Sequence, residues 1–167
     1  MQRILVIADT NGHLDAAREA IKSHGPWDHI VHLGDSMLDA VDLSVEMGLD
    51  IAAIRGNNEY EDSPEYGDRL VFEVDGVSFY AIHGHELDLG PSGADHEDGL
   101  ARLSETAKEA HADVALFGHT HVHLIKEGNG VMLINPGSIG SPDGKKTFAE
   151  IRVSDGKIEE ARIIETG

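Results

Sequence analysis

The chain has 167 residues, of which 40% are hydrophobic and none is cysteine, and its 13 Lys and Arg against 31 Asp and Glu give a net charge of −18. This length and apolar content predict one globular domain over residues 1–167, and the absence of cysteine excludes disulfides and thiolate chemistry. So acidic a chain argues against nucleic acid or membrane as a partner, because both are bound through clustered Lys and Arg. We find no membrane-spanning run and no signal peptide, so we expect a cytoplasmic protein.

The first third of the chain alternates strand and helix signals. Short apolar runs at 3–9, 29–35 and 50–57 are separated by two stretches with helical spacing, at 14–25 and 37–48. Strands that alternate with helices are typical of βαβ units, so we expect a parallel sheet here.

After residue 68 the pattern changes. Residues 69–84 read as two strands joined by Asp75 and Gly76, which is a strong hairpin signal. A helix is predicted over 94–112, and further strand signals follow at 113–119, 122–138 and 147–165. We expect the second half to be mostly antiparallel and the whole chain to form one α/β domain with two sheets.

Five of the apolar runs end in oxygen or nitrogen donors. The carboxyl ends of strands in open α/β sheets meet at one rim, where ligands bind. We therefore expect convergence on one rim of six side chains: Asp9, Asp35, Asn57, His83, His119 and His121. Carboxylates, an amide and imidazoles together suit a borderline divalent metal such as Mn, Fe, Co, Ni or Zn.

Each donor also has an ordinary structural interpretation. Asp9 or Asp35 alone is a helix N-cap about as often as a ligand, and Asn57 suits a turn. A single histidine at a strand end is more often structural or exposed. The metal prediction therefore depends on all five strand ends carrying donors together. If residues 115–125 are extended, His119, His121 and His123 also project to one side.

The ordered motifs D-x-(H), GD, GN, HGH, GHTH and NPGS resemble those of the calcineurin-like metallophosphoesterases. The chain is most similar to their small prokaryotic, YfcE-like phosphodiesterase branch, and the resemblance runs from Asp9 to the terminal hairpin. It implies a two-sheet β sandwich flanked by helices, in αββα layers. It also implies two divalent metal ions at the rim, which we expect to be Mn²⁺, with Ni²⁺, Zn²⁺, Fe²⁺, Co²⁺ or Mg²⁺ as alternatives.

The resemblance also assigns site residues by motif. The first metal would be held by Asp9, Asn11, Asp35 and His121, and the second by Asp35 as a bridge, Asn57, His83 and His119. Catalytic roles would fall to Asp35, Asn58 and His85. His85 lies outside the ligand set, and either it holds substrate or orients a ligand, or it is a plain loop histidine. His123 lies outside the motif and is expected in a strand near the rim.

Two positions depart from the family pattern. The family's DTHGN reads DTNGH here, so Asn11 stands where a metal-binding His is expected and His13 follows two residues later. An amide oxygen is a weaker donor than imidazole to these metals, so the first metal should bind less tightly. Rescue by His13 would require a rerouted loop. Asn58 replaces a His that serves as an acid near the leaving group in many members, which leaves that protonation to water or to His85.

The resemblance implies hydrolysis of phosphate esters, in which a metal-bridging hydroxide attacks phosphorus. The acidic chain favours a small phosphodiester or nucleotide over nucleic acid. The alternative is a catalytically weak or inactive scaffold of the same fold, as in the related retromer subunit. Asn11 favours that alternative, whereas the six intact ligand positions favour an enzyme. The oligomeric state is left open, with a homo-oligomer as one option.

Overall fold

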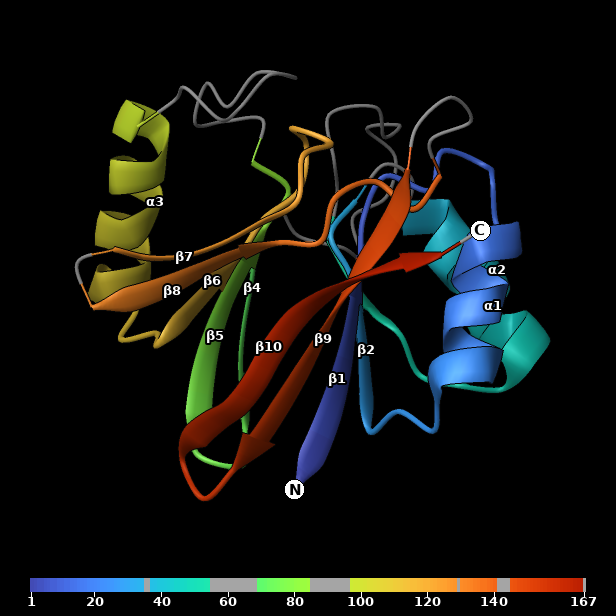
Figure 1. The fold of residues 1–167 in the computed structure, drawn as a ribbon, viewed down its shortest axis with the longest axis horizontal. Helices are drawn as coiled ribbons and strands as arrows, with labels where there is room; N and C mark the ends of the chain where they lie inside the picture. The colour runs from blue at the N-terminus through green and yellow to red at the C-terminus, as the bar shows by residue number, and fades with distance from the viewer. Residues whose placement is uncertain (35–36, 55–68, 85–96, 129, 141–144, 167) are drawn as a thin grey trace.

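The protein is described by a computed structural model that covers residues 1–34, 37–54, 69–84, 97–128, 130–140 and 145–166. These residues form two five-stranded sheets that pack face to face, with helices on the two outer faces (Figure 1). The αββα layers expected from the family resemblance are therefore confirmed.

The first sheet has the strand order β10-β9-β1-β2-β3. Its strands are β1 (Gln2–Ile7), β2 (His29–His32), β3 (Ala52–Ala53), β9 (Lys146–Ser154) and β10 (Lys157–Thr166). Strands β1, β2 and β3 are parallel to one another, as the βαβ alternation predicts. Strand β9 pairs antiparallel with β1, and β10 pairs antiparallel with β9, so segments from both ends of the chain share one sheet.

The second sheet has the strand order β4-β5-β6-β8-β7. Its strands are β4 (Arg69–Val74), β5 (Val77–Ile82), β6 (Val114–Leu116), β7 (Leu124–Gly128) and β8 (Val131–Asn135). The predicted hairpin is confirmed, because β4 and β5 pair antiparallel across a turn in which Asp75 and Gly76 both have positive φ.

The expectation of a mostly antiparallel second half is wrong for the centre of this sheet. Strand β6 is parallel both to β5 and to β8. The helix α3 (Glu97–Glu109) lies between β5 and β6 in the chain. Such a crossover brings the chain back to the end of the sheet at which β5 began, so β6 runs parallel to β5.

The helices cover the outer faces through separate apolar clusters. Helices α1 (Asp15–His24) and α2 (Met37–Met47) pack on the first sheet, and α3 packs on the second (Figure 1). Strand β1 shows the alternation that this requires, because Ile4 and Val6 face the other sheet whereas Leu5 and Ile7 face the helical layer. None of the described helices is long and apolar enough to cross a membrane.

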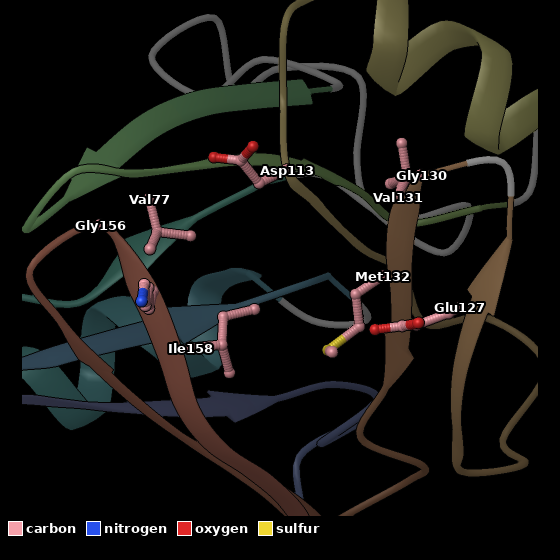
Figure 2. Close-up of a pocket in the computed structure, with 9 residues that line it drawn as sticks. Val77, Asp113, Glu127, Gly130, Val131, Met132, Gly156 and Ile158 are labelled. Atoms are coloured by element: carbon pink, nitrogen blue, oxygen red, sulfur yellow. The ribbon is translucent and has the colours of Figure 1, made fainter.

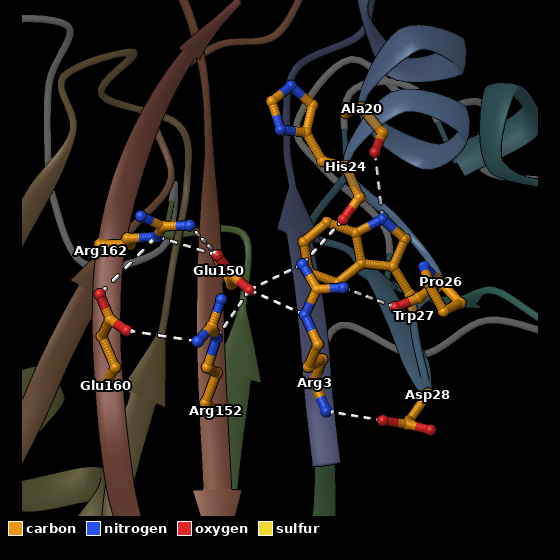
Figure 3. A network of polar contacts seen from close by, with 10 residues as sticks. All are labelled: Arg3, Ala20, His24, Pro26, Trp27, Asp28, Glu150, Arg152, Glu160 and Arg162. Carbon is orange, nitrogen blue, oxygen red and sulfur yellow. Dashed lines mark hydrogen bonds and ion pairs between the residues drawn. The ribbon is translucent and has the colours of Figure 1, made fainter. Parts of the chain in front are cut away.

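One buried carboxylate on the first sheet is surrounded by arginines (Figure 3). Glu150 is 1% exposed and accepts hydrogen bonds from Arg3 at 2.9 Å, Arg152 at 3.0 Å and Arg162 at 2.9 Å. Burial alone would raise the pKa of Glu150, but the hydrogen bonds from Arg162, Arg152 and Arg3 outweigh it and lower the pKa to about 2. The network ties β1, β9 and β10 together.

Replacing Glu150 with Gln should lower the free energy of unfolding at pH 7 by about 2–3 kcal/mol, because three arginines lose their common anion. Because the folded-state pKa lies below the usual 4.5, the stabilisation is complete above about pH 4.5 and is lost as the pH falls toward 2. Urea unfolding of both proteins at pH 7 and pH 3 would measure this, and the difference between them should shrink at pH 3.

A matched control is Glu160→Gln. Glu160 is half exposed and reaches Arg152 and Arg162 only at 3.7 and 3.8 Å. An exposed pair of this kind contributes less than about 1 kcal/mol. If the two variants were equally stable at pH 7, the arginine cluster would not hold the sheet as described.

Candidate metal centre

The carboxyl ends of β1, β5 and β6 lie together at one rim of the sandwich. Asp9 follows β1, His83 follows β5, and the GHTH loop of residues 118–121 follows β6. Backbone hydrogen bonds hold these segments in place: the N–H of Asp9 donates to the carbonyl of Gly34, just after β2, at 2.9 Å, and the N–H of Gly118 donates to the carbonyl of His83 at 2.8 Å. The strand topology therefore brings together residues that are distant in sequence at one site.

Asp9 is the most unusual residue of this rim. Its side chain is completely buried, yet neither Oδ1 nor Oδ2 has a hydrogen-bond partner in the part of the chain that the structure describes. Burying a carboxylate without hydrogen bonds costs several kcal/mol unless a cation compensates it. The residue therefore fits a site in which a cation is bound.

Two imidazoles face the Asp9 carboxylate. The Nε2 atom of His121 lies 3.6 Å from Asp9 Oδ1, and the Nε2 atom of His83 lies 3.8 Å from the same oxygen. Both separations are too long for a hydrogen bond. Bonds of about 2.0–2.2 Å from a metal to nitrogen and oxygen allow two of its ligands to lie as far as about 4.3 Å apart. The Asp9–His121 distance thus suits two ligands of one cation, and His83 lies near enough to bind a neighbouring one.

The orientation of His83 is set by the first sheet. Its Nδ1 lies 2.7 Å from the carbonyl oxygen of Leu33, which can only accept, so Nδ1 carries the proton. Nε2 then presents its lone pair on the side of Asp9. A backbone carbonyl that fixes the tautomer in this way is a common partner of metal-binding histidines. The His119 ring packs edge-on against His83, with 5.2 Å between ring centroids.

Left-handed backbone conformations gather at this rim. Four predicted ligands have positive φ: Asp9 at 57°, Asn11 at 47°, His119 at 67° and His121 at 63°. Three further non-glycine residues with positive φ are described, and they lie in the two hairpin turns or just after α3. Strained backbone at non-glycine residues is typical of functional sites. It also overturns one expectation, because residues 117–123 are a loop rather than an extended strand.

The NPGS segment supports the rim from behind. The buried Asn135 amide donates to the Thr120 hydroxyl at 2.9 Å and to the Gly118 carbonyl at 3.2 Å. The Ser138 hydroxyl donates to the Asp9 carbonyl at 3.2 Å. The backbone at Gly140 packs directly on that of Thr10, where a Cβ atom would overlap the Thr10 carbonyl. The motif was noted in the sequence, but only the structure shows what it holds.

The structure thus brings together four of the predicted ligands: Asp9, His83, His119 and His121. Asn11 lies on the same loop as Asp9 but is exposed. His123 is exposed and precedes β7 by one residue.

The other predicted site residues fall outside the described part of the chain: Asp35, Asn57, Asn58 and His85. Among the described residues, no group of three or more His, Cys, Asp or Glu side chains is arranged to hold a metal ion by itself. The ligand roles therefore stay a prediction, which the buried Asp9 carboxylate and its two imidazoles fit.

A cavity lies at the end of the sandwich opposite to the metal rim. Its volume is about 640 Å³, and its lining includes the start of β5 at Val77 and the β9–β10 turn at Gly156. Figure 2 shows Val77, Gly156 and Ile158 on one side of it and Met132 on the other. Because the predicted ligands follow the carboxyl ends of β1, β5 and β6, this cavity is not part of the metal rim.

Comparison with known proteins agrees with this arrangement. A probable metallophosphoesterase of Mycoplasma pneumoniae is 28% identical in an alignment that covers 96% of this chain and 95% of the relative. The solved structure of an archaeal phosphodiesterase is similar with a TM-score of 0.73 at 25% identity, over 98% of this chain and 99% of that one. Vps29 of Entamoeba histolytica, solved in complex with Zn²⁺, has a TM-score of 0.70 at 16% identity over 98% of both chains, which shows a shared fold alone.

The family model of the calcineurin-like phosphoesterase superfamily domain matches residues 2–156. Relatives named as metallophosphoesterases imply divalent metal ions, in keeping with the donors at the rim. Together with the fold and the order of the motifs, this match shows that the chain belongs to the calcineurin-like phosphoesterase superfamily.

Proposed function

We propose that this phosphoesterase hydrolyses small phosphodiesters with two divalent metal ions bound at the rim. The observation that carries the proposal is the buried Asp9 carboxylate, which has no hydrogen-bond partner among the described residues and is faced by His83 and His121. Folding a carboxylate into such a place is unfavourable without a bound cation. The archaeal phosphodiesterase of similar structure supports the choice of a diester.

The proposed ligand sets follow the motifs. The first metal would be held by Asp9, Asn11, Asp35 and His121, and the second by Asp35, Asn57, His83 and His119. Mixed oxygen and nitrogen donors suit Mn²⁺, our first expectation, and also Zn²⁺, Fe²⁺, Co²⁺ and Ni²⁺, with Mg²⁺ less well matched. When bound, the two metals supply a hydroxide for in-line attack on phosphorus and neutralise charge on the phosphoryl oxygens.

The residues of the chain bind and orient the reacting groups. The Leu33 carbonyl holds the proton of the neutral His83 ring on Nδ1, which directs the Nε2 lone pair toward Asp9, and the buried Asn135 holds the loop that carries His119 and His121. Asn58 has no acidic proton to give to a leaving group, so we assign that protonation to water or to His85. This favours substrates with good leaving groups.

A small polar cavity lies beside residues 8–14, the loop between β1 and α1 that carries Asp9 (the Asp9 loop), and supports a small anionic substrate. Its volume is about 240 Å³, and it is lined by Gly12, His13, Leu14, Asp15, Arg18 and Lys146. Arg18 is already bonded to Asp15 at 3.0 Å and to Glu46 at 2.7 Å, so Lys146 and His13 would meet an anionic group of the substrate. Elsewhere the net charge of −18 repels a polyanion such as nucleic acid.

A scaffold without activity is the second candidate. The feature that favours it is Asn11, which weakens one proposed ligand position. A scaffold would bind partner proteins through the same fold and would show no metal-dependent turnover. The first experiment below separates the two functions.

The purified protein should hydrolyse a generic phosphodiester such as bis(p-nitrophenyl) phosphate in the presence of Mn²⁺. A chelator should abolish the activity, and added Mn²⁺ should restore it. Asp35→Ala should lower kcat by at least about 10³-fold, because a bridging carboxylate serves both metals, whereas Asp42→Ala on the exposed side of α2 should not. Near-normal turnover by Asp35→Ala would contradict the two-metal mechanism, and inactivity of the wild type on every ester would favour the scaffold.

Replacing Asp9 with Asn should stabilise the metal-free protein while removing its response to metal. A buried amide costs less than a buried, uncompensated carboxylate, so we expect a gain of about 1–2 kcal/mol, or roughly 3–6 °C in Tm. Mn²⁺ should raise the Tm of the wild type but not of Asp9→Asn. Thermal unfolding with and without Mn²⁺ measures both effects. A less stable metal-free variant would show that Asp9 is a structural residue.

Two residues of the Asp9 loop, Asn11 and His13, depart from the family pattern. Asn11→His should raise metal affinity at the first site and lower the Mn²⁺ concentration needed for activity, because imidazole is the stronger donor. His13→Ala should leave the metal affinity of both sites nearly unchanged, since His13 is exposed and outside the proposed ligand set. Metal titration with direct metal counting tests this. Tight binding at both sites in the wild type that is lost in His13→Ala would make His13 the ligand.

A further inference from the structure

Three buried polar side chains connect the Asp9 loop to the segments packed against it. Thr10 and His32 are completely buried, and Asp39 is 8% exposed. They come from three different segments: Thr10 from the loop after β1, His32 from the end of β2, and Asp39 from the first turn of α2. None of them belongs to the proposed ligand set.

The hydrogen bonds between them run in one direction. The N–H of Gly34 donates to Nδ1 of His32 at 3.0 Å, so the neutral ring carries its proton on Nε2. That Nε2–H faces the Thr10 hydroxyl at 2.9 Å, and the hydroxyl donates to Asp39 Oδ2 at 2.6 Å. The same carboxylate oxygen accepts the backbone N–H of Gly12 at 2.7 Å.

Asp39 therefore accepts hydrogen bonds from the residues on both sides of Asn11. Its two hydrogen bonds come from Thr10 and Gly12, which flank that proposed ligand, and Thr10 directly follows Asp9. The backbone of this loop is strained at two non-glycine residues, Asp9 and Asn11, which both have positive φ. A strained loop keeps such a conformation only where its surroundings hold it there.

An acidic residue in the first turn of a helix often serves only to stabilise that helix. The contacts of Asp39 indicate a further role, because its carboxylate accepts hydrogen bonds from two residues of the Asp9 loop, Thr10 and Gly12. The network also reaches β2, which leads directly to the proposed bridging ligand Asp35 through Gly34. It thus connects the two chain segments that would supply the first metal with Asp9, Asn11 and Asp35.

We propose that Asp39 is a positioning residue that, through Thr10 and Gly12, holds the Asp9 loop in the shape that binds the first metal. The proposal rests on the proposed two-metal function. The network acts before metal arrives, by keeping the donors of the loop arranged. Loss of an outer hydrogen-bond partner of this kind typically lowers metal affinity 10–100-fold.

The main test measures Mn²⁺ binding to the full chain by calorimetry and by metal counting. Asp39→Ala should weaken the first site by at least about 10-fold and leave the second site within about 3-fold of the wild type. Asp39→Asn should retain most of the affinity, because its amide oxygen can still accept both hydrogen bonds. Asp42→Ala removes the same charge from the exposed side of α2 and should change neither site.

A second pair of variants tests the same network without changing charge. Thr10→Val keeps the shape of the side chain but removes the hydroxyl, and should weaken the first site as Asp39→Ala does. Thr10→Ser keeps the hydroxyl and should preserve the affinity. In both weakened variants the Mn²⁺ concentration for half-maximal hydrolysis should rise, whereas kcat at saturating Mn²⁺ should stay within about 3-fold of the wild type.

The outcomes separate the two proposals. A wild type that binds two metals and hydrolyses diesters, with Asp39→Ala and Thr10→Val binding equally well, would overturn the positioning role alone. Equal weakening of both sites together with a lowered Tm of the metal-free variants would also overturn it, because that pattern indicates a general structural role. A wild type that binds no metal would overturn the proposed function as well.

Discussion

The central constraint on the structure is an energetically unfavourable one: the Asp9 carboxylate is buried without hydrogen bonds from the described residues. Strand β1 is central in its sheet and buried on both faces, so the residue that follows it enters the rim with no access to water. The backbone at Asp9 is held by neighbouring segments of the chain. The NPGS segment holds its carbonyl through Ser138, and Gly140 packs on the next peptide.

A second buried carboxylate in the same sheet shows what a purely structural solution looks like. Glu150 is as deeply buried as Asp9, but three arginines donate hydrogen bonds to it and lower its pKa to about 2. The chain has only 13 Lys and Arg, and three of them are used at this one position. That Asp9 receives imidazole nitrogens at 3.6 and 3.8 Å instead is consistent with a place kept for a metal cation.

Much of the fold could be predicted from the sequence, because its periodicity is strong near the N-terminus and its turns carry Asp-Gly pairs. The parallel β5–β6–β8 arrangement was missed, because α3 between β5 and β6, and β7 between β6 and β8, indicate strand direction only once the strands are known to be neighbours. The strand ends predicted the convergence of Asp9 with the histidines. The buried network of Thr10, His32 and Asp39 was not predicted. A histidine inside the apolar run at 29–35 was the available signal that a buried polar contact lies there.

The energetics of the rim also bear on whether this chain is an enzyme or a scaffold. A scaffold gains nothing from a buried, uncompensated carboxylate, and substitution of Asp9 by a neutral residue would make it more stable. Strained backbone at His119 and His121 would likewise be relieved without loss. Natural proteins retain such costs mainly where function requires them. A weaker donor at the proposed ligand position Asn11 would change only how tightly one metal is held, whereas the buried Asp9 carboxylate would still favour binding a cation.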